Sequence, residues 1–321
     1  MPRYPGVSAL LELQSDLWLD QPDAHERIEE RLARGAMSGA EAALLHLFVD
    51  DGYLKFPISL DAEFCEGFDE DVARIWRDRP ADLAISPRGP AGPTAFSDYE
   101  GPVRDPGYRI PDLHSHSDHA RAIYLHPEIF RMVELIYDQP AIAFQSLYFE
   151  YGSEQGLHRD PMFVVTDPPT HLLASWVALE DITPDSGPLA YAPKTHRWPW
   201  FEFEPGTVVC GQRVPPEKRQ EHGQWTRDML RDQSLEVLPF TCRRGDAFIW
   251  HGGLLHGGTP IDNPERTRRS FVVHYCTAAH KSSRTASMRV REGEDWRRIS
   301  RSTDSVIESE RGRGLDNPMR T

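Results

Sequence analysis

The segment GLHRDPM carries a histidine and an aspartate, His158 and Asp160, that are separated by one residue. On an extended strand, residues i and i+2 point to the same face, so both side chains can reach one ion. A later histidine on a neighbouring strand would complete a 2-His-1-carboxylate facial triad. That ligand set suits non-haem Fe(II), because it leaves three coordination positions open for a cosubstrate and O2.

The third ligand is not fixed by spacing. The segment GDAFIWHGGLLHGGTP offers both His251 and His256, in glycine-rich surroundings that let the backbone pass close to a ligand. From the residues alone, the two histidines remain equal candidates. His171, His196 and His274 are also available, and each is expected to be a hydrogen-bonded structural histidine.

A second His-x-Asp pair, His116 and Asp118 in DLHSHSDHAR, is a rival for the metal motif. This segment leads into a predicted helix, where Ser117 and Asp118 suit an N-cap better than a metal strand. We therefore expect the three histidines here to lie on a solvated loop (His114, His116 and His119). The pair at 158 and 160 precedes a strand-rich region and is the favoured site.

The charge balance limits the partners. Asp and Glu number 50 against 36 Lys and Arg, a formal net charge of −14. Such a surface repels phosphate backbones and anionic membranes, so we expect neither nucleic acid nor a membrane as a partner. The four cysteines form no CxxC pair, which favours reduced thiols in a cytoplasmic protein over a cysteine zinc site. A small-molecule substrate is expected, and the oligomeric state cannot be deduced.

Residues 1–117 are predicted to form an N-terminal helical region and a loop packed on the core. Ser38 and Glu41 form a capping-box pattern, which predicts a helix that ends near Gly52. A second helix is expected over residues 61–77, whose apolar residues recur on one face. Residues 78–108 are rich in Pro and Gly and favour an irregular loop. Helical spacing returns at residues 118–140, with Pro127 as a helix start.

Residues 118–280 are predicted to form the core, and beyond residue 141 the pattern changes to short strands and turns. The strand candidates are rich in aromatic and β-branched residues and are separated by Gly, Pro and Asp. They are AIAFQSLYFEYG, HLLASWVALEDI, GPLAYAP, QSLEVLPF, GDAFIWHGG and RSFVVHYCTA. This pattern is typical of a sandwich or jelly roll. A polar insertion at 196–234 interrupts the core, and residues 281–321 form an Arg- and Ser-rich C-terminal tail.

Three arginines enter the last of these strands, in the segment RTRRSFVV: Arg266, Arg268 and Arg269. A guanidinium that points into a barrel is well suited to a bidentate carboxylate contact. 2-Oxoglutarate offers such a carboxylate at its far end, while its keto acid end would chelate iron. Two of the three arginines are expected to pair with surface acids instead.

The chain resembles the phytanoyl-CoA dioxygenase family of Fe(II)/2-oxoglutarate oxygenases. The similarity runs in order from about residue 118 to residue 276, roughly half of the chain. It includes ARAIYLHPEIFRMVELI, the strand FQSLYFEYG before LHRDP, SWVALEDITPDSGPLAYAPKTHR, and GDAFIWHGGLLHGGTPIDNPERTRRSFVVHY. The resemblance implies a mainly β fold with helices, whose core is a double-stranded β-helix of the jelly-roll, cupin-like type.

The resemblance also implies roles for individual residues. The distal iron ligand of the family falls on His256, in the LLHG element, and the arginine that grips the far carboxylate of 2-oxoglutarate falls on Arg268. Trp176 aligns with a residue beside the cosubstrate, and Gln145 is a further pocket contact by the same comparison. One departure affects the pocket entrance: the chain has Lys194 where the family usually has Gly. The family's second polar contact near the distal histidine has no matching side chain at Gly257 and Gly258, and Thr259 is not counted as its replacement.

The implied activity is a dioxygenase reaction that hydroxylates an unactivated C–H bond of a small molecule, of secondary-metabolite or acyl type, and releases succinate and CO2. The cofactors would be Fe(II), 2-oxoglutarate and O2. Desaturation, cyclisation and epoxidation use the same chemistry and remain alternatives, as does a non-catalytic cupin-like binding protein. Asp160 disfavours halogenation, which requires a small residue at the carboxylate position. The aromatic segment 198–203 and the loop 78–108 are expected to form the lid.

Overall fold

The structure is a computed structural model that describes residues 10–11, 13, 15–87, 92–104, 107–211 and 214–280, and the backbone of three short strands between residues 288 and 309. Apart from those strands, the predicted tail at 281–321 lies outside the described residues. In the part of the chain that is described, no helix is both long and apolar enough to cross a membrane.

The centre of the fold is a large antiparallel sheet of nine strands. Its order is β16-β15-β14-β6-β13-β7-β11-β2, and β5 pairs with the free part of the β6 edge. The strands are β2 (Tyr53–Pro57), β5 (Arg109–Pro111), β6 (Ala141–Phe149), β7 (Leu173–Ala178), β11 (Asp246–His251), β13 (Ser270–Thr277), β14 (Met288–Glu292), β15 (Asp295–Ile299) and β16 (Val306–Ser309).

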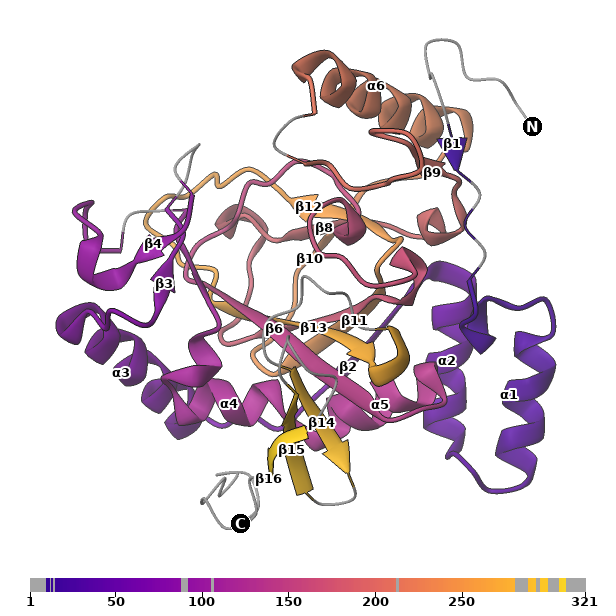
Figure 1. The fold of residues 1–321 in the computed structure, drawn as a ribbon, viewed down its shortest axis with the longest axis horizontal. Helices are drawn as coiled ribbons and strands as arrows, with labels where there is room; N and C mark the ends of the chain where they lie inside the picture. The colour runs from indigo at the N-terminus through magenta and orange to yellow at the C-terminus, as the bar shows by residue number, and fades with distance from the viewer. Residues whose placement is uncertain are drawn as a thin grey trace.

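A smaller sheet faces the large one. It contains β8 (Leu189–Ala192), β10 (Leu238–Phe240) and β12 (Leu255–Gly258) in the order β10-β8-β12. Figure 1 shows the small sheet on one side of β6, β13 and β11, and helices α3, α4 and α5 on the other. Two facing antiparallel sheets are the arrangement of a jelly roll. The predicted fold class, a β-helix core with an N-terminal helical region, is confirmed.

Successive side chains along the strands of the large sheet point alternately into two hydrophobic cores, one on each face of the sheet. On β7, Leu173 and Val177 pack toward the helices, whereas Trp176 packs toward the small sheet. On β11, Ile249 faces the helices and Trp250 faces the small sheet. This alternation follows from the two-residue period of a strand, and it makes both faces of the sheet apolar. Side chains on the inner face therefore meet the small sheet, where a ligand can be enclosed.

Apart from α1, for which no start was predicted, the helices of the N-terminal region and of the core begin where their sequence signals predict. They are α1 (Ala24–Ala33), α2 (Gly39–Asp51), α3 (Ala62–Asp78), α4 (Asp118–Tyr124) and α5 (Pro127–Tyr137). The Ser38 hydroxyl accepts a hydrogen bond from the Glu41 amide, the Glu41 carboxylate accepts one from the Ser38 amide, and Gly52 ends α2 in a left-handed conformation. The stretch 118–140 forms two helices rather than one, because Pro127 starts α5 at its first position.

The insertion at 196–234 carries β9 (Trp200–Phe201) and the helix α6 (Pro216–Asp232), and it packs on the far side of the small sheet. Three aromatic residues at the start of the insertion, Trp198, Phe201 and Phe203, form a buried cluster with Trp225 and Met229 of α6. None of these aromatic residues lines the cavity described below. The expected lid function of segment 198–203 is therefore not supported, since the aromatics anchor the insertion to the barrel instead.

Candidate metal centre

The His158–Asp160 motif lies where the two sheets approach each other. His158 forms an isolated antiparallel bridge with His256 on β12, with N–O distances of 2.8 and 3.0 Å in the two backbone hydrogen bonds. The sequence predicted a continuous strand through Asp160, but Asp160 begins the 3-10 turn η4 (Asp160–Met162). Pro161 explains the difference, because it has no N–H to donate to a ladder.

The bridge and the turn still direct three side chains to one point. One ligand atom from each of His158, Asp160 and His256 lies within 4.8 Å of the others, and all three residues are buried. The Asp160 Oδ1 atom is 3.9 Å from His158 Nε2 and 3.4 Å from His256 Nε2. Two imidazole nitrogens and one carboxylate oxygen are the donor set of the predicted facial triad.

The backbone fixes the tautomer of both histidines. His158 Nδ1 lies 2.9 Å from the Gly156 carbonyl oxygen, and His256 Nδ1 lies 3.0 Å from the Leu254 carbonyl oxygen. A carbonyl oxygen can only accept, so each Nδ1 carries the hydrogen and donates it. Both Nε2 atoms are then unprotonated and available for a metal. Such outer hydrogen bonds orient metal-binding histidines, so these residues fit a divalent metal ion.

The carboxylate of Asp160 is held from its other side. Trp250 donates a hydrogen bond of 2.8 Å from its indole nitrogen to Asp160 Oδ2, and His274 Nε2 lies 3.8 Å from the same oxygen. Because Oδ2 is occupied, Oδ1 is the oxygen left to face the two histidines. The sequence analysis did not find Trp250, although its alternation with the core residues of β11 indicates an inward side chain.

Burial and mutual contact determine the charge states at this centre. Burial and the neighbouring His256 lower the pKa of His158 to about 3, so its ring is neutral at neutral pH. Burial alone would raise the pKa of Asp160, but the nearby His256 and His274 hold it well below its usual range. Burial alone would lower the pKa of His256, but Asp160 raises it. The carboxylate is therefore ionised and compensated by its neighbours.

The two rival histidine sites lie elsewhere. His251 is the last residue of β11 and points away from the small sheet, with its Nε2 3.3 Å from the Asp20 carboxylate. His116 pairs with Asp82 at 3.0 Å. Ser117 caps α4 through a hydrogen bond of 2.9 Å from the Ala120 amide, which is the structure expected for that segment.

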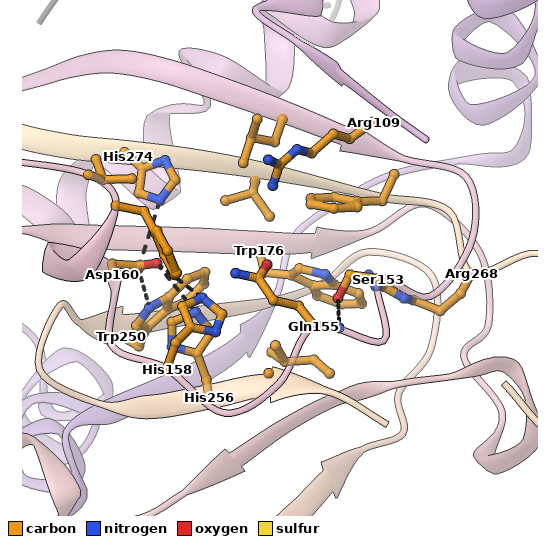
Figure 2. A pocket seen from close by; sticks show the side chains of 17 residues that line it. Arg109, Ser153, Gln155, His158, Asp160, Trp176, Trp250, His256, Arg268 and His274 are labelled. Carbon is orange, nitrogen blue, oxygen red and sulfur yellow. Dashed lines mark hydrogen bonds and ion pairs between the residues drawn. The ribbon is translucent and has the colours of Figure 1, made fainter. Parts of the chain in front are cut away.

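A cavity of about 210 Å³ opens beside the triad, and Figure 2 shows the side chains that line it. The triad and Trp250 lie at one end, and Arg268 lies at the opposite end. Trp176 lies between them. Six apolar side chains also line the cavity: Leu147, Phe149, Phe163, Val164, Leu189 and Val272.

Arg268 is buried without a carboxylate partner within the described part of the chain. Its Nη1 donates a hydrogen bond of 2.6 Å to Ser270 Oγ, and its Nε has no hydrogen-bond partner there. The guanidinium carbon lies 5.6 Å from the ring centre of Phe149 and 5.7 Å from that of Trp176. Burial lowers its pKa to about 10, so the group remains charged at neutral pH. A buried cation with free donors suits an anionic ligand.

The other two arginines of this segment pair with acids, as two of the three were expected to do. Arg266 contacts Asp185 at 3.2 Å, and Arg269 contacts Glu180 at 2.9 Å and also Asp69. Only their position in the strand distinguishes the three in sequence.

Arg109 is a second arginine of the cavity wall, and the sequence analysis did not identify it. It lies on β5, and its guanidinium points into the cavity (Figure 2). Its one described side-chain hydrogen bond goes from Nε to Ser86 Oγ at 3.4 Å. Burial lowers its pKa. The residue follows the irregular loop 78–108, where no periodic pattern gives the direction of a side chain.

The residues suggested beside the cosubstrate are placed differently from one another. Trp176 lies on the inner face of β7 and lines the cavity, with its Nε1 unpaired among the described atoms. Gln145 lies half-buried on β6, two residues before the lining residue Leu147, and is not itself part of the cavity wall. A different glutamine, Gln155, lines the cavity with Ser153. Thr259 is also absent from the wall, and its hydroxyl donates to the Pro188 carbonyl oxygen.

Arg159, between the two motif ligands, points away from the cavity into the insertion. Its guanidinium donates hydrogen bonds to the carbonyl oxygens of Thr195 (2.9 Å) and Pro199 (3.1 Å). It also lies 4.9 Å from the ring centre of Trp200 and 5.7 Å from that of Trp198. Burial lowers its pKa to about 9. These contacts tie the backbone of the metal motif to the insertion.

Lys194 keeps the turn that the family usually builds with Gly. It adopts a left-handed conformation with φ of 71°, and its amide donates to the Asp51 carbonyl oxygen at 2.9 Å. A side chain at positive φ is strained, which explains why Gly is suited to this position.

Two facing sheets with a buried 2-His-1-carboxylate set between them define a double-stranded β-helix protein of the metal-dependent type. The family model for phytanoyl-CoA dioxygenase (PhyH) matches residues 48–270, more than half of the chain. The chain belongs to the phytanoyl-CoA dioxygenase family. The expected family is confirmed by this match.

Curated relatives share part of this chain. Phytanoyl-CoA dioxygenase domain-containing protein 1 of Mus musculus is 26% identical over 180 residues, which cover 52% of this chain and 56% of the relative. The Bos taurus protein of the same name is 28% identical over 154 residues, which cover 44% and 47% of the two chains. The chain thus spans about half the length of the curated relatives that it matches.

Solved structures with low sequence identity share the fold. The nogalamycin-biosynthesis epimerase SnoN is 18% identical with a TM-score of 0.52, and the match covers 79% of this chain and 84% of SnoN. The carbocyclase SnoK is 16% identical with a TM-score of 0.54, covering 81% and 88%. EctD from S. alaskensis, crystallised with 2-oxoglutarate and 5-hydroxyectoine, is 18% identical with a TM-score of 0.53, covering 88% and 83%.

Proposed function

We propose that this chain is an Fe(II)/2-oxoglutarate-dependent dioxygenase that hydroxylates an unactivated C–H bond of a small-molecule substrate and releases succinate and CO2. In this proposal His158, Asp160 and His256 bind the iron, and Arg268 binds the far carboxylate of 2-oxoglutarate. The observation that carries the proposal is the position of Arg268, a buried cation at the end of the cavity opposite the triad. A hydrolytic metal site would have no need of a cation at that position.

The chain's own residues would position the reactants and exclude water. Iron bound at the triad would supply the activation of O2 that couples decarboxylation of 2-oxoglutarate to oxidation of the substrate. Trp250 would hold the second oxygen of Asp160, so that one carboxylate oxygen faces the metal. Trp176 would form the wall along the cosubstrate, and Ser270 would orient the Arg268 guanidinium. Arg109 would supply a second positive charge for a carboxylate in the cavity.

The cavity favours a substrate with an apolar portion. Phe163 follows η4, stacks edge-on against His158 with 5.4 Å between ring centres, and is 53% exposed. A phenylalanine that is half open to solvent beside a metal ligand can be covered by a substrate, which gains hydrophobic stabilisation in proportion to the area covered. Val164 and Leu189 extend this apolar wall.

The proposal can be tested by anaerobic reconstitution with Fe(II) and 2-oxoglutarate. We expect the weak visible metal-to-ligand charge-transfer band, and succinate formation when O2 and a suitable substrate are added. Asp160→Ala should lose both, whereas His116→Ala, at the rival motif, should keep both. Absence of the band in the unmodified chain would refute the assignment of 2-oxoglutarate as cosubstrate. Loss of the band in His116→Ala but not in Asp160→Ala would assign the iron site to the His116–Asp118 motif instead.

A different outcome of the same chemistry is the second candidate. The solved structures that share the fold include an epimerase and a carbocyclase, so the fold supports products other than an alcohol in those proteins. Mass analysis of the product distinguishes the outcomes. A gain of one oxygen atom indicates hydroxylation or epoxidation, a loss of two hydrogens indicates ring closure or desaturation, and an unchanged mass with succinate release indicates epimerisation.

A further inference from the structure

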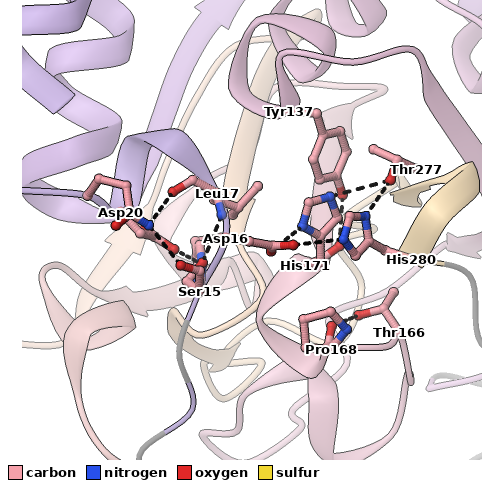
Figure 3. Close-up of polar contacts among 12 residues, drawn as sticks. Ser15, Asp16, Leu17, Asp20, Tyr137, Thr166, Pro168, His171, Thr277 and His280 are labelled. Carbon is pink, nitrogen blue, oxygen red and sulfur yellow. Dashed lines mark hydrogen bonds and ion pairs between the residues drawn. The ribbon is translucent and has the colours of Figure 1, made fainter.

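A second cluster of two histidines and one aspartate lies apart from the cavity. One ligand atom from each of Asp16, His171 and His280 lies within 4.8 Å of the others. None of the three residues lines the cavity beside the iron triad. Figure 3 shows the Asp16 side chain directed at both imidazole rings, which lie side by side. The set of donor atoms is the same as that of the iron triad, although nothing in the proposed reaction uses it.

The two rings present one nitrogen each to the same carboxylate. His171 Nδ1 lies 3.0 Å from Asp16 Oδ1, and His280 Nε2 lies 2.8 Å from Asp16 Oδ2. The opposite nitrogens of both rings face one hydroxyl, that of Thr277. Its Oγ1 lies 2.7 Å from His280 Nδ1 and 3.5 Å from His171 Nε2.

The rings are held in this orientation by stacking. The ring centres of His171 and His280 are 3.5 Å apart with an interplanar angle of 24°, and Tyr137 stacks on the other side of His171 at 4.8 Å. His171 is buried, whereas the Asp16 side chain is 54% exposed. The cluster therefore has a rigid inner part and an outer side that opens to solvent.

The hydrogens of this cluster are placed better with a cation than with two neutral rings alone. When both rings are neutral and no cation is present, both facing nitrogens donate to Asp16, which leaves both outer nitrogens as acceptors. An extra proton on one ring would also supply the missing hydrogen, and the zinc measurements below distinguish that case from a metal ion. The Thr277 hydroxyl has a single hydrogen and can satisfy only one of them. When a cation replaces the two facing hydrogens, the outer nitrogens carry hydrogens instead. Thr277 Oγ1 can accept both, because a hydroxyl oxygen has two lone pairs.

We infer that Asp16, His171 and His280 form a second metal site, which takes a divalent transition-metal ion of the zinc type. Zinc bonds of ~2.0–2.1 Å in tetrahedral geometry place ligand atoms ~3.3 Å apart. The observed N–O pairs, at 3.0 and 2.8 Å, go to different oxygens of Asp16. To bind one ion, the carboxylate must turn so that one oxygen faces both nitrogens, and the stacked rings must tilt apart from their interplanar angle of 24°. Water completes the tetrahedron on the exposed side, and Thr277 is the outer hydrogen-bond partner that orients both rings.

The site joins three segments that are distant in sequence. Asp16 precedes the first turn of the fold and is 155 residues from His171 and 264 residues from His280. His171 ends η5 (Pro169–His171), at the end of the loop that starts at Asp160 and carries Phe163. A metal cross-link that closes such long loops restricts the unfolded chain and stabilises the folded one. The ion would hold the far end of a loop that begins at the iron triad.

Zinc binding by a chain with a disabled iron triad tests the inference. In the Asp160→Ala/His256→Ala chain, equilibrium dialysis should find one bound equivalent of Zn²⁺, and adding Asp16→Asn or His280→Ala should abolish it. Co²⁺ in place of zinc should give the intense visible bands of tetrahedral coordination. As a matched control, His25→Ala/His46→Ala removes another stacked histidine pair, at the surface, and should keep the bound equivalent.

The unmodified triad provides an independent measurement in case the double variant does not fold. The wild-type chain should bind two equivalents of zinc and Asp16→Asn one, and zinc should raise the melting temperature of the wild type more than that of Asp16→Asn. Retention of zinc by the variants of Asp16 and His280, or no zinc bound outside the iron triad, would overturn the inference. So would a loss of stability in Asp16→Asn that is the same with and without zinc, because a hydrogen-bonded contact alone explains it.

Discussion

The two His₂Asp clusters of this protein have the same ligand types in different surroundings. At the iron triad all three residues are buried, both histidines donate from Nδ1 to backbone carbonyls, and a cavity with a buried arginine lies alongside. At the peripheral cluster the carboxylate is half exposed, both outer nitrogens share the Thr277 hydroxyl, and Asp16 is 155 residues from His171 and 264 residues from His280.

The comparison shows that the donor set alone does not define the chemistry. A reactive centre needs open coordination positions inside a dry cavity and a second charged group to place the cosubstrate. A structural site needs the opposite, ligands from distant segments and no enclosed space for a substrate. The proposed iron triad fits the first description, and the proposed peripheral site fits the second. The predictions below separate the two.

The largest expected effect comes from His256. His256→Ala removes one of the three converging atoms, so Fe(II) binding at the triad and succinate formation should fall below detection. His251→Gln is the matched control, since glutamine keeps a polar side chain next to the Asp20 carboxylate and the residue lies outside the triad. Metal content of the folded protein, measured by inductively coupled plasma spectrometry, distinguishes them. Metal loss in His251→Gln together with metal retention in His256→Ala would exchange the roles of the two histidines, and equal loss in both would contradict the assignment of His256 alone.

Arg268 should give the next largest effect. Arg268→Met removes the cation at the far end of the cavity and leaves the metal ligands intact. We expect the KM for 2-oxoglutarate to rise by about 30-fold or more, because losing one partner of a buried charge pair costs about 2–5 kcal/mol. Arg266→Met, two residues earlier at an exposed ion pair, should change KM by less than about twofold. Steady-state kinetics with varied 2-oxoglutarate provides the measurement. An unchanged KM in Arg268→Met would contradict the proposed carboxylate contact.

Trp250 should give a smaller effect on the same centre. Trp250→Phe removes the hydrogen bond to Asp160 and keeps an aromatic ring in place. We expect Fe(II) affinity to fall by about 10-fold, the lower end of the loss seen when an outer-shell partner of a metal ligand is removed. Trp18→Phe removes a buried indole hydrogen bond of 3.0 Å to the Leu135 carbonyl and should leave Fe(II) affinity unchanged. Similar weakening in both variants would indicate a general loss of stability.

The smallest expected effect is on how the stability of the whole protein depends on pH, which sets the pH range in which both clusters can be measured in folded protein. Burial lowers the pKa of His126 from 6.5 to about 4, so protonation favours the unfolded chain. This contribution to the free energy of unfolding is lost as pH falls from about 6.5 toward about 4. His126→Asn should make urea unfolding less sensitive to pH in that window, whereas His25→Asn, at an exposed position, should not. If the free energy of unfolding of His126→Asn changed with pH as steeply as that of the wild type, His126 would not be the group that makes stability depend on pH in this window.

Local signals in the sequence predicted much of the fold. The capping box at Ser38, the start of α5 at Pro127 and the short strands after residue 141 all act between near neighbours, so they are visible without tertiary structure. The jelly-roll core and the family are confirmed, and both depended on several motifs in the right order. The continuous strand through Asp160 was a wrong prediction, although Pro161 was its visible warning.

The parts of the site that escaped prediction depend on contacts between distant segments. His251 and His256 could not be separated, because the tight turn after β11 places them on different sheets. Trp250 acts on Asp160 across 90 residues of sequence, and Asp16 meets His280 across 264. Arg109 emerges from an irregular loop. Spacing gives no information about such pairs until the strands are registered against each other.

The contacts of Arg159 have a consequence for how this enzyme class can be altered. Its guanidinium obtains its hydrogen bonds from the Thr195–Pro199 backbone, although its own backbone lies between two metal ligands. The insertion therefore helps to hold the backbone between His158 and Asp160 in place, so it cannot be exchanged without affecting these two residues. Engineering that trims or swaps residues 196–234 to change selectivity would loosen the proposed metal ligands, whereas changes to the half-exposed Phe163 side chain would act on the cavity wall and on its ring contact with His158.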